Sequence, residues 1–127
     1  MPELNEEDVL KLSSISQGSI GKALSYAQNG GLEIYQNLQD VLFSGLSFNL
    51  SKALKLAEDA SSDEKVWQLT VELILGMIVD MVKSGEKAQS FLDVYQDILK
   101  LSREVSALNM DKKQAMLNMI YLIVKAI

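Results

Sequence analysis

The sequence predicts an all-α protein, a helical bundle, from three observations. The chain is rich in Leu, Ala, Lys, Glu and Met and contains a single proline, a composition that favours helices. Apolar residues recur at helical spacing, and no alternating strand pattern competes with them. Gly and Ser mark the places where one periodic stretch ends and the next begins. The 127 residues suit one domain with a small appended piece.

Two short helices are predicted before residue 30. Asn5 is a suitable N-cap, and Glu6–Asp8 follow it in the first turn, where the helix dipole favours carboxylates. Gly18 ends this helix, and Ser19 can cap the second one. The run Asn29–Gly31 ends the second helix and is the strongest candidate for a domain boundary.

Two further helices are predicted before residue 60. The first covers about Leu32–Phe43, where apolar residues have helical spacing, and Ser44–Gly45 forms the turn after it. Ser47 is the predicted N-cap of the second, which runs to about Asp59.

The longest predicted helix extends from Ser61 to about Lys83. Ser61 and Glu64 have the spacing of a capping box. The apolar residues lie on nearly every side: Val66, Trp67, Leu69, Val71, Leu73, Ile74, Leu75, Met77, Ile78, Val79, Met81 and Val82. All-round apolarity is typical of a central, buried helix. Glu72 and Asp80 interrupt it, so it does not resemble a membrane span, which needs about 20 apolar residues.

The last two predicted helices follow a break at Ser84–Gly85. The first runs from about Lys87 to Leu108, and Asp111 with Gln114 caps the second. The second helix has an excess of apolar residues: Met116, Leu117, Met119, Ile120, Tyr121, Leu122, Ile123 and Val124. Too few polar positions remain for one solvated face, so we expect a second apolar side that a partner covers.

Composition excludes several chemistries. Without cysteine or histidine, the chain has no disulfides, thiolate metal sites, cysteine nucleophiles or histidine bases. A cysteine-free chain is compatible with a reducing cytoplasm. The net charge of −5 argues against a nucleic-acid groove, which needs clustered Lys and Arg. The start of the chain, Met1–Asp8, is acidic and polar, unlike a signal peptide.

The segment Gly18–Gly21 and its neighbour Lys22 bear on two phosphate-binding motifs. A P-loop needs a glycine and a Ser or Thr at positions that Ser16 and Ala23 occupy here. A KH-type GXXG loop needs a sheet and a basic surface, and neither is predicted. On spacing alone, the segment is best interpreted as a glycine break followed by a serine cap.

The carboxylates do not form a catalytic pair. Glu58, Asp59, Asp63 and Glu64 flank a helix–helix turn, and we interpret them as a solvated corner, just as Glu6–Asp8 serve a helix dipole. Glu72 and Asp80, eight residues apart on the central helix, come closest to a functional pair. For them a structural or interface role is favoured, since burial would require a charged partner. Trp67 and the methionines fit a core or a partner-binding surface. The residues alone therefore indicate a non-enzymatic helical domain.

Four segments carry a family resemblance: Pro2–Leu4, Gln17–Leu24, Gly30–Tyr35 and Ala107–Gln114. In this order they resemble the C-terminal part of the delta-prime subunits of bacterial DNA polymerase III, which belong to the AAA+ clamp loaders. Between about residues 44 and 89 the chain matches only as a helical pattern.

The resemblance implies two parts. Residues 1–29 would be the last two helices of the AAA+ lid, and residues 30–127 a five-helix collar domain that joins loader subunits into a ring. An ATPase-like domain is expected upstream. The expected partners are the gamma/tau and delta subunits in the cytoplasm, with DNA reached only through the full complex. No membrane, small-molecule substrate, cofactor or metal is expected.

One position departs from the ATP-hydrolysing sister subunits. They resemble Gly-Ser-x-Arg-Asp-Ala-Leu in this region, and the arginine of this sensor-2 motif reaches the nucleotide phosphates. This chain has Gly21 at that position, which offers no donor, and Lys22 lies about 100° further round the helix. We therefore expect no catalytic and no cofactor-binding residue. The alternatives are an unrelated helical adaptor that presents a groove to partner helices and, less favoured, an enzyme fragment whose site lies elsewhere.

Overall fold

The computed structural model describes residues 30–45, 48–85 and 87–127. Five helices make up this part: α3 (Gly31–Leu42), α4 (Leu50–Ser61), α5 (Glu64–Lys83), α6 (Ala88–Leu108) and α7 (Lys112–Ala126). No strand occurs in the described ranges, and the predicted all-α bundle is confirmed. The two helices predicted before residue 30, and with them Gly21 and Lys22, lie outside the described residues.

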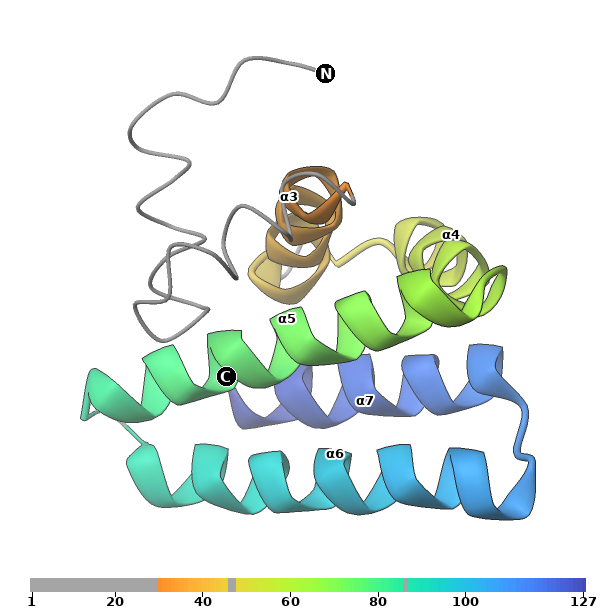
Figure 1. The fold of residues 1–127 in the computed structure, drawn as a ribbon. Coiled ribbons are helices and arrows are strands. Elements are labelled where there is room, and N and C mark those ends of the chain that lie inside the picture. Colours follow the sequence, from red (N-terminus) through yellow and green to blue (C-terminus); the bar gives the residue numbers. More distant parts are fainter. Residues whose placement is uncertain (1–29, 46–47, 86) are drawn as a thin grey trace.

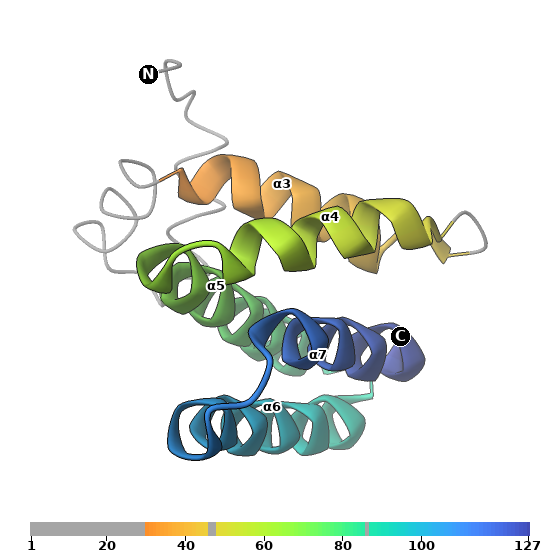
Figure 2. The same ribbon diagram turned by 90° about the vertical axis from the view of Figure 1, so that its right-hand side faces the viewer.

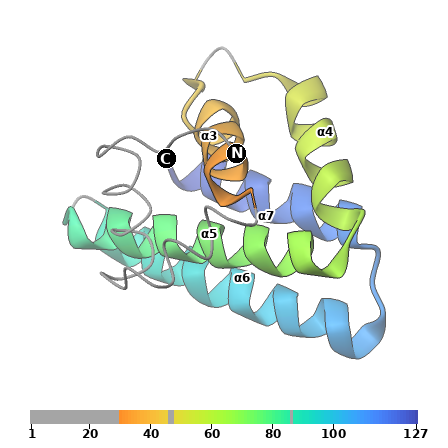
Figure 3. The same ribbon diagram turned by 45° about the horizontal axis from the view of Figure 1, so that its top comes forward.

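The helices form a three-helix layer crossed by a helical pair. α5, α6 and α7 run up and down, and α3 and α4 pack across α5 and α7, on the side away from α6 (Figure 1). α3 lies over α5 (Figure 2), and α4 crosses α7 and packs against it (Figure 3). α3 and α4 are drawn next to each other above α5 and α7 (Figure 3). α3 therefore packs mainly against α5, and α4 mainly against α7, with less contact between α3 and α4.

α5 lies at the centre of the fold, as its sequence predicts. Its buried residues cover several sides of the helix: Trp67, Leu69, Thr70, Val71, Leu73, Ile74, Gly76, Met77 and Ile78. The buried hydroxyl of Thr70 donates to the carbonyl of Val66 at 2.7 Å, so it needs no partner from another helix. Toward the C-terminal end, Val79, Met81 and Val82 are only half-buried. The centre of the bundle therefore lies along the first two-thirds of α5.

The start of α4 differs from the prediction. Asn49, and not Ser47, is the N-cap, and its side-chain oxygen accepts hydrogen bonds from the amides of Ser51 at 2.9 Å and Lys52 at 3.3 Å. Asparagine caps a helix at least as well as serine, so a later cap was available in the sequence. The helix consequently begins at Leu50.

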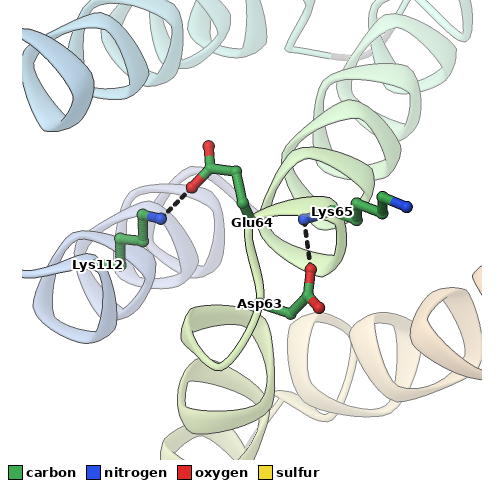
Figure 4. A network of polar contacts seen from close by, with 4 residues as sticks. All are labelled: Asp63, Glu64, Lys65 and Lys112. Carbon is green, nitrogen blue, oxygen red and sulfur yellow. Dashed lines mark hydrogen bonds and ion pairs between the residues drawn. The ribbon is translucent and has the colours of Figure 1, made fainter.

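The predicted capping box of α5 is wrong. Ser61 is the last residue of α4, and its hydroxyl donates to the carbonyl of Glu58 at 2.9 Å. Asp63 caps α5 instead, and its carboxylate accepts from the amide of Lys65 at 2.7 Å (Figure 4). The Glu64 side chain bonds to Lys112 of α7. The box fails because Ser61 still belongs to the preceding helix.

The end of α5 and the start of α7 agree better with the prediction from the sequence. α5 ends at Lys83 with Ser84 as its C-cap, and Gly85 follows with φ +86°, a conformation that favours glycine. Asp111 caps α7 by accepting from the amide of Lys113 at 3.0 Å. Gln114 does not complete the predicted cap, because its amide donates to Asn118 one turn further on.

Replacing the observed cap of α5 should cost more than replacing the predicted one. We expect Asp63→Ala to lower the free energy of unfolding by about 0.5–2 kcal/mol. Ser61→Ala, the matched control, should change it by less than about 0.5 kcal/mol. Urea denaturation of both variants measures the difference, and equal losses would contradict the assigned cap.

Trp67 should be a major source of stability, because only 3% of its surface is exposed. Truncating a buried tryptophan costs about 3–5 kcal/mol, so Trp67→Ala should unfold at a much lower urea concentration. Gln68→Ala, at the exposed neighbouring position, is the control. An unchanged midpoint for Trp67→Ala would show that α5 is not the centre of the core.

Candidate interaction surface

Two ion pairs fix the beginning of α7 against the corner between α4 and α5. Lys113 lies 3.7 Å from the carboxylate of Glu58, and Lys112 bonds to Glu64 (Figure 4). Such exposed pairs contribute only about 0–1 kcal/mol each. Their importance here is geometric, because they show which turn of α4 lies opposite which turn of α7.

The other predicted carboxylate sites are on the surface. Asp59 and Asp63 are exposed, like Glu58 and Glu64, so the corner between α4 and α5 is solvated. Glu72 and Asp80 are also exposed on α5. They do not form a buried pair. Because both side chains are exposed, neither position needs a charged partner to offset burial.

Apolar residues lie on the sides of α4 and α7 that carry the ion pair between Glu58 and Lys113. Leu50 and Leu54 precede Glu58 at four-residue intervals, so the three share one side of α4. Leu117 and Tyr121 follow Lys113 at the same interval on α7. α4 packs against α7, and the ion pair between Lys113 and Glu58 shows that these two sides meet at that turn of each helix.

We call these four residues the α4–α7 ridge: Leu50, Leu54, Leu117 and Tyr121. Leu50 is 61% exposed, Leu54 37% and Tyr121 64%, whereas Leu117 is half-buried. Phe43 and Phe48, in the connection before α4, are exposed as well. Large apolar side chains that gather on a surface are typical of sites where another molecule binds.

The second apolar side predicted for the last helix is smaller than the sequence indicated. Met116, Met119, Ile120 and Ile123 are buried in the core. Leu117, Leu122 and Val124 are half-buried, and Tyr121 alone among the eight predicted residues is exposed. α4 and α6 pack against α7 and cover part of its second apolar side. Sequence periodicity does not reveal contacts between helices that are far apart in the sequence.

Sequence reasoning missed the contribution of α4. Its signal was present, because Leu50 and Leu54 lie four residues apart, each three residues before a buried alanine, at the margin of the core-facing side. A helix with apolar residues beyond its core-facing side has an additional surface to cover.

A hollow between α3 and α4 has a charged rim, unlike the apolar ridge. It has a volume of about 380 Å³, and its rim carries carboxylates and lysines: Glu33, Asp40, Asp59, Lys52 and Lys55. Among the described residues, no three acidic side chains gather closely enough to hold a metal ion. The described helices also include none with the length and apolar character needed to cross a bilayer.

Comparisons with protein-family models, with curated proteins and with solved structures found no match to this chain. The candidate site therefore depends on its own geometry. The ridge offers apolar contact area and a peripheral ion pair, and such a surface is suited to binding another protein.

Proposed function

We propose that this chain is a non-catalytic assembly subunit of a clamp loader, equivalent to the C-terminal part of a delta-prime subunit. The observation that carries the proposal is the α4–α7 ridge, since exposed Leu50 and Tyr121 on a helical domain are suited to a subunit interface. The four segments that resemble delta-prime subunits specify which assembly. In this proposal residues 30–127 form the collar domain, and gamma/tau and delta are the partners.

The alternative is an unrelated helical adaptor that binds partner helices. The hollow between α3 and α4 favours it, because a hollow with a charged rim between two helices can accept a polypeptide segment. Co-purification with the gamma and delta subunits separates the two proposals. A clamp-loader subunit is retained with them, whereas an unrelated adaptor is not.

The ridge should control binding to the partners. Leu50→Glu and Tyr121→Glu each place a charge in the proposed interface, and we expect each to weaken binding to the gamma/tau and delta collars at least about tenfold. Gln96→Glu on the exposed side of α6 is the matched control and should bind normally. Biosensor titration measures the affinities.

The three variants should remain folded. Leu50, Tyr121 and Gln96 are exposed, so their substitutions should change the free energy of unfolding by less than about 0.5 kcal/mol. Unweakened binding by folded ridge variants would contradict the proposal. A stable homopentamer in light scattering would contradict it too, because a ring of unlike subunits does not require that the two sides of one subunit fit each other.

The proposal also predicts that the chain does not bind ATP. It lacks a P-loop, and Gly21 stands where sister subunits have a phosphate-contacting arginine. Calorimetry with ATP and magnesium should detect no micromolar binding, and Gly21→Arg should not create it. Micromolar binding by the unmodified chain would contradict a non-catalytic role.

A further inference from the structure

A second surface lies on the other side of Tyr121. Between α6 and α7 the structure contains an open groove of about 360 Å³, lined by Asp97, Lys100, Leu101, Glu104, Asn118, Tyr121 and Leu122. Leu101 and Leu122 are half-buried, and the Tyr121 side chain is exposed beside them. The groove therefore combines an apolar base with charged residues along one edge.

The shape of the groove suits a helix. Its α6 side extends from Asp97 to Glu104, which is about 10 Å or two helical turns. Two antiparallel helices leave a channel along their axes, and the side chains of a third helix can enter it at i, i+4 and i+7. An open, elongated channel of this kind is less suited to a small molecule, which binds in concave pockets that bury most of its surface.

The charges indicate what kind of helix fits. Among the described residues that line the groove, Lys100 is the only cation, and its ammonium lies 4.0 Å from the carboxylate of Glu104. No described cation lies within ion-pair distance of Asp97. Asp93, one turn before it, is also exposed. Asp93, Asp97 and Glu104 on this side of α6 therefore carry more negative charge than Lys100 can offset.

We propose that the α6–α7 groove binds an amphipathic helix of a partner protein, with apolar residues toward Leu101 and Leu122 and a basic edge toward Asp97. The inference rests on the proposed assembly function and names a second contact with its chemistry. A lysine or arginine on the partner would supply the missing cation at Asp97. An acidic helix would meet Asp93 and Asp97 with like charge, so the groove selects partners by the sign of their charge.

Two synthetic peptides test the proposal with the 127-residue chain. One helical peptide carries leucines at i, i+4 and i+7 and a row of lysines on the adjacent edge, and the other has glutamates in place of those lysines. Fluorescence anisotropy measures the affinity of each peptide. Amide NMR spectra locate the site, and we expect shifts concentrated in residues 97–104 and 118–122 for the lysine peptide.

Charge reversal supplies the decisive comparison. Asp97→Lys should lower the affinity of the lysine peptide for the chain at least fivefold and raise the affinity of the glutamate peptide. Asp59→Lys is the matched control, because Asp59 is an exposed carboxylate on the rim of the α3–α4 hollow. It should change either affinity by less than twofold. Circular dichroism checks that both variants are folded.

Three outcomes would overturn the proposal: equal affinities of the two peptides that Asp97→Lys leaves unchanged, no binding at millimolar peptide, or shifts centred elsewhere. A dimer of the chain that Asp97→Lys dissociates would assign the groove to a second copy and would also overturn it. Failure here is distinguishable from failure of the proposed function through Leu50→Glu, because Leu50, unlike Tyr121, does not line the groove.

Discussion

The burial of α5 is the constraint on which the rest of the described structure depends. Its core-facing residues point in several directions, so no single neighbour can cover them. α3, α4 and α6 contact it from different sides, and α7 packs against α4 and α6. The crossing of the outer pair over the layer in Figure 1 thus follows from an apolar helix that must be enclosed.

The same arrangement determines which surfaces remain outside. α4 turns its small residues Ala53, Ala57 and Ala60 toward the core, which brings it close to its neighbours and leaves Leu50 and Leu54 at its margin. α7 is enclosed from two sides and exposes Tyr121 between them. Apolar residues at these margins contribute little to the core, and their presence is understandable if a partner protein covers them.

Local sequence signals predicted the five described helices well and the junctions between them less well. The all-round apolarity of residues 66–82 correctly indicated a central helix, because burial leaves a direct record in composition. Polar residues follow one another at 61–64, and composition did not reveal that Ser61 ends one helix while Asp63 begins the next. The ridge was harder to predict than the junctions, because it requires contact between α4 and α7, about 60 residues apart in sequence. Hydrophobic periodicity carries no information about such a contact.

Hydrogen–deuterium exchange of the chain, alone and mixed with gamma/tau and delta collars, tests the central claim most directly. In the free chain, amides along the first two-thirds of α5 should exchange most slowly, since they open only with the whole bundle. On mixing, the account predicts added protection at the start of α4 and along the outer side of α7, with no change at the α3–α4 hollow. Added protection confined to that hollow, or none at all, would contradict the assignment of the ridge as the surface that joins this chain to its partners.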